Sequence, residues 1–233
     1  MTVGGVFLTV LMPAYNEEAG LTHAVNRLSA RLDELPITTE ILIVNDCSRD
    51  QTGALAETLA AHHSRVRVIH HSNNRGIGGG FVTGVANAHG QWLILIPADL
   101  ALDLADLSKY LEAAEGADVV VGIRSDRRDY SWFRLLVSWV NIRLTQLLFG
   151  MRERQFNYIC MYRLDLLKRI EIKYWQSAFF HAEVLIKIKR LGGRLVEREI
   201  RYTPRLSGKA TGARWSTILR SVQDLIHFRL RSD

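Results

Sequence analysis

The sequence predicts an α/β protein with a mostly parallel sheet, and three observations lead to this prediction. Five short apolar runs have the length and residue types of buried strands. Stretches with helical periodicity lie between successive runs, and each run ends in a polar or glycine-rich turn. Strand, turn and helix in repetition indicate parallel strands joined by right-handed crossovers. The predicted strands are 6–12, 40–44, 65–69, 92–96 and 118–122, and the predicted helices lie near 18–34, 52–62, 78–89 and 103–115.

The turns that follow the predicted strands hold the residues best suited to chemistry. In parallel sheets, ligands bind beyond the carboxyl ends of the strands. Four of the five turns contain acidic residues and three contain arginine. The sequence therefore places a candidate site at this edge of the sheet. The turns are 13–18, 45–52, 71–80, 97–100 and 122–126.

Size and charge limit the possible functions. The chain has 233 residues, of which 48% are hydrophobic, so it can bury a substantial core. A formal net charge of +6 favours an anionic partner: nucleic acid, a phosphorylated substrate or an acidic membrane surface. The basic residues are spread over several turns and helices without a recognised nucleic-acid-binding motif, so we do not expect nucleic acid.

Several features predict a cytoplasmic chain. Cys47 and Cys160 are far apart and form no CxxC motif, and the first residues do not resemble a secretory signal. The most apolar late segment, 133–149, is interrupted by Arg134 and Arg143, so no membrane-spanning helix is expected.

The second turn offers one candidate ligand-binding residue and two candidate caps. Asp46 follows an apolar strand directly, where its carboxylate could accept a hydrogen bond from a base or a ribose. Asp50 or Ser48 could instead cap the helix that follows.

The third turn is rich in glycine at the point where a strand passes into a helix. Free backbone N–H groups there could cradle a phosphate, although a flexible turn explains the same composition. Phe81 occupies the position where the dinucleotide fingerprint needs its third glycine, so that motif is not present. The glycines are Gly76, Gly78, Gly79, Gly80 and Gly84.

Four histidines form two adjacent pairs. Neighbouring residues do not share a helix face, and no acid or cysteine completes a set of metal ligands. We interpret them as surface residues. They are His62, His63, His70 and His71.

Taken in order, VLMPAYNEE, ILIVNDCSRDQT, NNRGIGGGFVTGVANAHGQWLILIPADL and DVVVGIRSD resemble the family 2 inverting glycosyltransferases. That family usually has a PxYNE turn, a DDxSxDxT turn, an NxGxGxAxxxG helix and a DxD strand end. The later VLIKIKRLGGRLVEREIRYTPRLSGKAT is similar to the polyprenyl-phosphate sugar transferases of the dolichol-phosphate mannose synthase type. The resemblance implies a glycosyltransferase A-type domain over 1–204, with 205–233 forming its acceptor-side loop and C-terminal amphipathic helix.

The resemblance also implies a set of site residues. Arg124 would lie near the phosphate of a lipid acceptor, while Arg205 and Lys209 would close over the diphosphate; Arg134 is a further phosphate-binding candidate. For Glu17 a first-turn role beside the helix dipole is the alternative. The implied nucleotide-binding residues are Pro13, Ala14, Tyr15, Glu17, Asp46, Gly76 and Asp99.

Two positions depart from the family pattern. The DxD motif has become Pro97, Ala98 and Asp99, so one acid remains, and the paired acids of the second turn have become Asn45 and Asp46. Mg²⁺ or Mn²⁺ can be held by one carboxylate together with substrate phosphates and waters, so Asp99 could bind a weakly held metal. Capping of a helix beginning near Leu102 is the alternative for Asp99.

The acceptor side lacks an obvious general base. Glu153 is the only acid in 152–163, where many relatives carry one, and this fits an acceptor phosphate that is already ionised. Glu183 remains a candidate catalytic base or acceptor-orienting group, although such an acid often opens a helix.

Two amphipathic stretches bear on the acceptor and on localisation. Apolar residues of 132–148 alternate with Arg134 and Arg143 and could form an interfacial helix, or could pack on the core or on a second copy of the chain. A basic amphipathic stretch also ends the chain. We expect an enzyme peripherally attached to the cytoplasmic membrane face that transfers a nucleotide-activated sugar to a polyprenyl phosphate. A hydroxyl acceptor, or a degenerate nucleotide-binding protein without turnover, are the alternatives.

Overall fold

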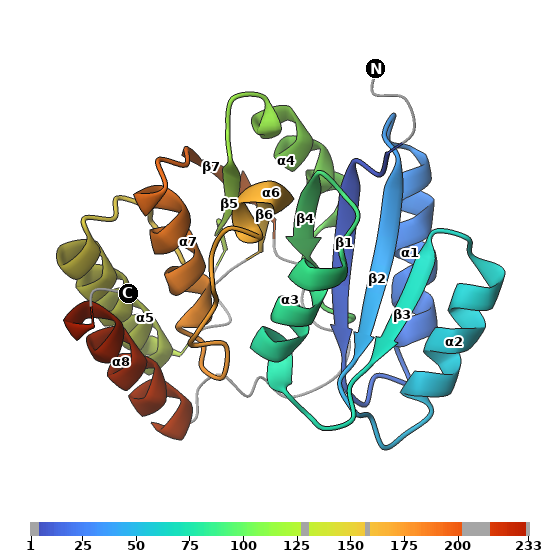
Figure 1. Cartoon of the computed structure of the whole chain (residues 1–233), viewed down its shortest axis with the longest axis horizontal. Helices are drawn as coiled ribbons and strands as arrows, with labels where there is room; N and C mark the ends of the chain where they lie inside the picture. Colours follow the sequence, from blue (N-terminus) through green and yellow to red (C-terminus); the bar gives the residue numbers. More distant parts are fainter. Residues whose placement is uncertain (1–4, 127–130, 157–158, 202–214, 232–233) are drawn as a thin grey trace.

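The computed structural model describes residues 5–126, 131–156, 159–201 and 215–231. Within them, one sheet runs through the molecule in the order β3-β2-β1-β4-β6-β5-β7 (Figure 1). Neighbouring strands are parallel except at β6, which is antiparallel to β4 and β5. The strands are β1 (Leu8–Ala14), β2 (Thr39–Asn45), β3 (Val66–His70), β4 (Trp92–Leu95), β5 (Val119–Arg124), β6 (Cys160–Arg163) and β7 (Leu195–Ile200).

Helices cover both faces of the sheet and create two cores. Successive side chains of a strand point to opposite faces, so Val10 and Met12 of β1 join one core and Leu11 joins the other. Helices α1, α2 and α4 cover the first core, and α3, α7 and α8 cover the second. The helices are α1 (Leu21–Asp33), α2 (Thr52–His62), α3 (Gly76–Asn87), η1 (Leu104–Asp106, a 3₁₀ helix), α4 (Leu107–Ala114), α5 (Trp132–Phe149), α6 (Leu164–Leu167), α7 (Phe180–Arg190) and α8 (Trp215–Leu230).

The apolar spacing of the sequence explains the helices of the first core. In α1, Leu21, Val25, Leu28 and Leu32 recur at intervals of four, three and four residues, and all are buried. The five predicted strands are confirmed as β1 to β5, and the four predicted helices as α1 to α4. Strand β6 was not predicted, because its four residues are too few to show a period.

Helix α5 differs from the other helices because only Thr145 on it is buried. Ser131 begins the helix by accepting a hydrogen bond from Arg134 N at 3.3 Å, and Gly150, with φ of 65°, ends it. Among the described residues, no helix is long and apolar enough to cross a membrane. The division of the domain at residue 204 stays a prediction.

Candidate functional site

The carboxyl edge of the parallel strands contains an unusual backbone. Each turn after β1, β2, β3 and β4 has one residue with positive φ: Asn16 at 55°, Cys47 at 61°, Gly76 at 69° and Leu100 at 47°. Three of these are not glycine, and they are the non-glycine residues with positive φ among the part of the chain that is described. Strained conformations of this kind concentrate at functional sites, so the edge predicted from the sequence is also singled out by its geometry.

Side chains of the second turn hold the first turn in place. Thr52 Oγ1 accepts from Glu17 N at 2.7 Å, and Asp50 Oδ2 accepts from Glu18 N at 3.2 Å. Asp50 Oδ1 also accepts from Thr52 N, at the first residue of α2, at 3.0 Å, although the N-cap position itself is Gln51 and not Asp50 or Ser48. Tyr15 is exposed beside these contacts and remains available to a ligand.

Asp46 organises the turn between β3 and α3. Its Oδ1 accepts from Arg75 N at 2.8 Å, and its Oδ2 accepts from Gly76 N at 2.7 Å. His71 Nδ1 lies 2.7 Å from Asp46 Oδ1, and His71 Nε2 lies 2.8 Å from Thr83 Oγ1. In this arrangement the carboxylate of Asp46 and the N–H of Gly76 satisfy each other. Their predicted contact with a nucleotide stays a prediction.

The interpretation of all four histidines as surface residues was wrong for His71. Its side chain is 6% exposed and lies between the carboxylate of Asp46 and the hydroxyl of Thr83. His70 agrees better with the interpretation, because its side chain is 42% exposed and contacts Glu57. Adjacent positions on a strand end point to opposite sides, and this pattern could have separated the two.

Close packing accounts for two glycines of α3. A Cβ added at Gly78 would overlap the carbonyl oxygen of Trp175, and one added at Gly84 would overlap the side chain of Leu11. Gly80 packs against Pro13, from whose Cβ an added Cβ would lie 3.4 Å away. The glycine-rich composition therefore reflects the approach of α3 to β1 and to the segment before α7.

Asp99 lies in a tight turn after β4. Leu100 N donates to Pro97 O at 3.0 Å, and Ala101 N donates to Asp99 Oδ1 at 3.2 Å. The helix that follows is capped by Asp103, whose Oδ1 accepts from Ala105 N at 3.0 Å, so the proposed cap at Asp99 is not observed.

The side chains at this edge could hold a metal ion only together with oxygen atoms of a bound diphosphate. No group of three or more His, Cys, Asp or Glu residues that could hold a metal occurs in the described ranges. Half-buried Asp99 supplies one carboxylate. A single carboxylate is enough for Mg²⁺ or Mn²⁺ when diphosphate oxygens and waters complete the shell.

The predicted phosphate-binding residues are only partly described. Arg124 ends β5 and is buried; its backbone N donates to Gln155 Oε1 at 3.1 Å, and its carbonyl oxygen accepts from Gln155 Nε2 at 3.1 Å. Arg134 is half-buried in the first turn of α5. Arg205 and Lys209 lie outside the described residues.

Glu183 is fully buried in the first turn of α7, and its carboxylate is occupied. Its Oε1 accepts from Lys173 N at 2.9 Å and from Lys187 Nζ at 2.8 Å, while its Oε2 accepts from Tyr174 N at 2.9 Å. A general base needs an accessible oxygen, so this arrangement favours a structural role. Its predicted catalytic role stays a prediction.

His181, which the sequence analysis did not single out, lies two residues before Glu183. It is half-buried, and its ring centroid is 3.8 Å from that of Phe180. Desolvation lowers the pKa of His181 to about 4, so its imidazole is neutral at pH 7.

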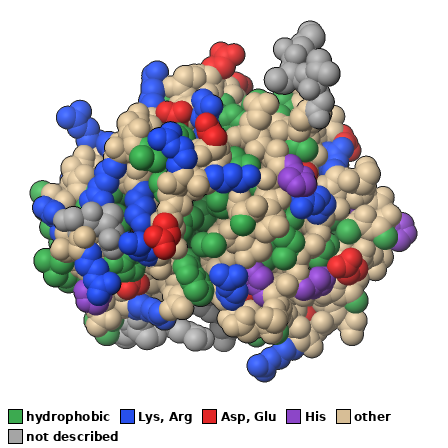
Figure 2. Space-filling view, in the orientation of Figure 1, with side chains coloured by type: hydrophobic (Ala, Val, Ile, Leu, Met, Phe, Trp, Pro, Cys, Tyr) green, Lys and Arg blue, Asp and Glu red, His purple; other side chains and the backbone are tan. Residues whose placement is uncertain are grey.

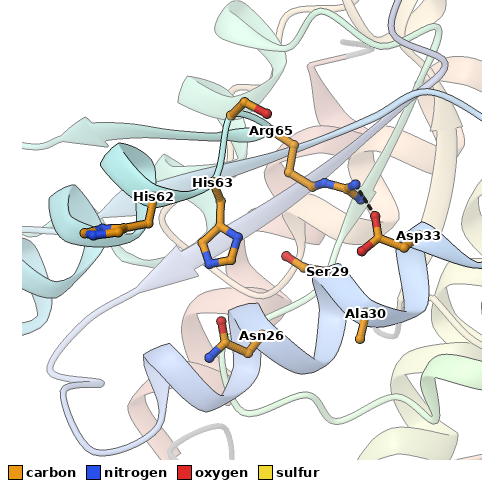
Figure 3. Close-up of a pocket in the computed structure, with 8 residues that line it drawn as sticks. Asn26, Ser29, Ala30, Asp33, His62, His63 and Arg65 are labelled. Carbon is orange, nitrogen blue, oxygen red and sulfur yellow. Dashed lines mark hydrogen bonds and ion pairs between the residues drawn. The ribbon is translucent and has the colours of Figure 1, made fainter.

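Two surface hollows lie at the opposite, amino edge of the parallel strands. One, of about 390 Å³, separates the end of α1 from the residues after α2 (Figure 3). Its Arg65 forms an ion pair with Asp33 and so is already neutralised. The other, of about 940 Å³, is lined by Phe7 and Trp92 near the starts of β1 and β4. Neither hollow contains a predicted site residue.

Sequence comparison assigns the family. The profile of glycosyl transferase family 2 matches residues 9–179, which extend from β1 to the segment before α7. The chain belongs to glycosyl transferase family 2.

Two relatives of this family 2 chain act on the same class of lipid, according to their names. The chain is 28% identical over 215 residues to an undecaprenyl-phosphate mannosyltransferase of Micrococcus luteus, covering 86% of this chain and 85% of the relative. It is 30% identical over 209 residues to an undecaprenyl-phosphate 4-deoxy-4-formamido-L-arabinose transferase of Edwardsiella ictaluri, covering 88% of this chain. The chain spans 62% of the length of that second relative.

Solved structures identify the fold of the family 2 chain. Glucosyl-3-phosphoglycerate synthase from Mycobacterium tuberculosis, crystallised with Mn²⁺, UDP and phosphoglyceric acid, superimposes with a TM-score of 0.72 at 18% identity. The match covers 97% of this chain and 78% of that one. The chain therefore has the α/β GT-A fold, and the predicted fold class and family resemblance are confirmed.

Proposed function

We propose that the protein transfers a sugar, with inversion, from a nucleoside-diphosphate sugar to a polyprenyl phosphate at the cytoplasmic face of a membrane. An oxygen of the acceptor phosphate forms a bond to the anomeric carbon while the bond from that carbon to the donor diphosphate breaks. The products are a polyprenyl-phosphate sugar and a nucleoside diphosphate. The observation that carries the proposal is the similarity to undecaprenyl-phosphate sugar transferases over most of the chain.

The carboxyl edge of β1, β2 and β4 is the proposed donor site. Tyr15 and Glu17 from the first turn, and the Asp46-organised turn, would surround the base and ribose. Pro13, Ala14 and Gly76 would shape the backbone around them. Asp99 would bind Mg²⁺ or Mn²⁺ together with the diphosphate, and the metal would stabilise the negative charge of the departing group.

The acids near the proposed acceptor site support an acceptor that is already ionised. Glu153 is 8% exposed, and Lys189 Nζ lies 2.9 Å from its Oε1. Glu183 is fully buried and paired with Lys187. A hydroxyl acceptor would need a base to remove its proton, whereas a phosphate would not. Arg124 and Arg134, with Arg205 and Lys209, are the proposed phosphate-binding residues.

The surface of α5 supports a membrane partner. Its exposed apolar residues recur at intervals of three, four and seven and so form one stripe. Arg143 lies on the same stripe, with its guanidinium 5.8 Å from the ring centroid of Trp139. An apolar stripe with cationic side chains is typical of a helix that lies in a lipid interface. The exposed apolar residues are Trp132, Leu135, Leu136, Trp139, Val140 and Leu147.

Helix α8 adds a second stripe of the same kind. Leu225 and Phe228 are buried in the core, while Leu219, Ile226 and Leu230 are exposed on the opposite side of the helix. Figure 2 shows hydrophobic side chains mixed with Lys and Arg where α5 and α8 lie in Figure 1. We propose that these two helices attach the protein peripherally to the membrane.

Nucleotide binding tests the donor half of the proposal. Calorimetry would measure binding of UDP and of GDP, with and without Mn²⁺, to the wild type and to Asp99→Ala and Asp99→Asn. We expect one diphosphate to bind with metal and both variants to lose the metal dependence. Asparagine keeps an oxygen that can accept from Ala101 N. Loss of the metal dependence in Asp99→Asn would therefore assign the effect to the charge of the carboxylate. If neither diphosphate binds under any condition, transfer from a UDP-sugar or a GDP-sugar is excluded, and a degenerate family member that binds a partner without turnover is favoured instead.

Transfer assays test the acceptor half. A labelled sugar would be offered from the matching nucleotide to polyprenyl phosphate and, as the matched control, to the polyprenol of the same length. We expect product only with the phosphate. Product from the polyprenol would instead favour a hydroxyl acceptor.

A further inference from the structure

The segment between α6 and α7, residues 168–179, is joined to α7 by hydrogen bonds. The backbone N–H groups of Lys173 and Tyr174 donate to Glu183 Oε1 and Oε2, each at 2.9 Å. Lys187 Nζ donates to Glu183 Oε1 at 2.8 Å and balances its buried charge. Because both oxygens of a fully buried carboxylate are occupied in this way, the middle of the segment is fixed relative to α7.

The same segment is also joined to α8. The ring of Tyr174 lies edge-on to those of Phe179 and Phe228, with centroid distances of 5.8 and 5.9 Å. The guanidinium of Arg220 donates to Gln176 Oε1. Aromatic packing and a hydrogen bond thus fix the segment from a second side.

On its remaining side the segment meets the turn that begins α3. The carbonyl oxygen of Trp175 occupies the space that a side chain at Gly78 would need. The guanidinium carbon of Arg75 lies 5.1 Å from the ring centroid of Trp175, within the range of a cation–π contact. The turn that Asp46 organises is therefore also in contact with Trp175.

Arg75 is restrained at three points. Its backbone N donates to Asp46 Oδ1 at 2.8 Å, its guanidinium donates to Thr83 Oγ1 at 3.3 Å, and Trp175 lies against the same guanidinium. The residue lies at the carboxyl edge of the sheet, next to Asp46. A guanidinium is well suited to diphosphate oxygens, because it is always charged and can donate two parallel hydrogen bonds.

We propose that Trp175 and Glu183 are positioning residues for the donor. Glu183 fixes the backbone of the segment, and Trp175 holds the guanidinium of Arg75 in place for the diphosphate of a bound nucleotide. A side chain that is already held loses less freedom when the ligand binds, so affinity is higher. This inference rests on the proposed donor site, but the contacts that carry it lie within the protein and need no bound nucleotide.

Calorimetry on the full chain with UDP and GDP tests the role of Trp175. Trp175→Leu removes the aromatic face, and Trp175→Phe keeps a smaller one. We expect the leucine variant to bind the diphosphate about threefold to tenfold more weakly, and the phenylalanine variant to lose less. In an Arg75→Ala background, the leucine substitution should have little further effect, because Trp175 acts through Arg75. Unchanged binding in Trp175→Leu, or an equal loss in both backgrounds, would overturn the proposal.

Hydrogen exchange provides a readout that needs no nucleotide. The amides of Arg75 and Gly76 should exchange faster in Trp175→Leu than in Trp175→Phe, while amides of α2 are unchanged. Glu183→Gln should also make these two amides exchange faster. If that variant does not fold, the comparison of Trp175→Leu with Trp175→Phe still tests the proposal. If the wild type binds neither diphosphate, the proposed function fails. Unaltered exchange at Arg75 and Gly76 would separately show that Trp175 does not hold this turn.

Discussion

Two carboxylates in each half of the molecule are used differently. In the N-terminal half, residues 5–101, Asp46 and Asp50 accept hydrogen bonds from backbone N–H groups of exposed turns. In the C-terminal half, residues 102–231, Glu153 and Glu183 are buried and paired with lysines of α7. Asp46 and Asp50 shape an edge that a ligand can reach, whereas Glu153 and Glu183 hold helices and segments together. An acid near the acceptor side is therefore weak evidence for a general base.

Asp106 shows the same use of charge at the start of α4. Arg201 Nη2 and Lys109 Nζ each lie 3.0 Å from its Oδ1. Burial alone would raise the pKa of Asp106, but the hydrogen bonds from Arg201 and Lys109 outweigh it and hold the pKa below its ordinary value. The stability from this group is present above the unfolded-state pKa and is lost as the pH falls through the lower folded-state pKa.

The largest expected effect comes from breaking a buried pair in the C-terminal half. Glu183→Ala leaves the charge of Lys187 without its carboxylate partner and two backbone N–H groups without their acceptor, and should lower the free energy of unfolding by about 3–5 kcal/mol. Urea denaturation measures the change. Glu171→Ala is the matched control, because Glu171 is exposed, and should change stability by less than about 0.5 kcal/mol. Equal effects of the two substitutions would contradict the structural role of Glu183.

A glycine of the N-terminal half should give the next largest effect. Gly78→Ala forces a methyl group into the carbonyl oxygen of Trp175, and we expect a loss of about 1–3 kcal/mol of stability in denaturant unfolding. Gly20→Ala is the control, because an added Cβ there meets nothing within 4 Å. If Gly78→Ala were as stable as Gly20→Ala, the contact between the two halves would not be tight.

The exposed stripe of α5 should matter for membrane binding and little for folding. Trp139→Glu removes apolar area from the lipid interface and should weaken binding to anionic vesicles about tenfold, with thermal stability unchanged. Leu191→Glu is the control, because it places the same charge at an exposed leucine that belongs to neither α5 nor α8. Cosedimentation with vesicles measures both, and equal retention of the two variants would argue against an interfacial α5.

The smallest expected effect concerns pH. Because burial lowers the pKa of His181 to about 4, the unfolded chain binds more protons than the folded one between pH 6.5 and 4. Stability should therefore fall as the pH decreases through this interval, with His181 contributing about 1 kcal/mol, since the residue is only half-buried. His181→Phe should reduce this slope in urea midpoints measured at pH 7 and pH 5. An unchanged slope would mean that His181 is not protonated differently in the two states.

The sequence predicted the frame of the molecule better than the contacts of its site. Apolar runs and helical spacing located β1 to β5 and α1 to α4, because burial on a strand or helix leaves a period in the sequence. The partners of Asp46 and Glu183 are backbone N–H groups 29 or 30 and 9 or 10 residues away, which no local pattern reveals. Position 78 has no room for a side chain because of the carbonyl oxygen of Trp175, nearly a hundred residues later, and this contact too exists only in the folded chain.

The reversed strand β6 has a consequence for how members of the family can diverge. Strands β3, β2, β1 and β4 form a continuous parallel block, and β6 joins it through three residue pairs with β4: Trp92 with Arg163, Leu93 with Tyr162 and Ile94 with Met161. So short a seam leaves the first hundred residues with their own strand order and turns. Substitutions beyond the seam can then leave the pairing of β3, β2, β1 and β4, and the turns that end these strands, unchanged.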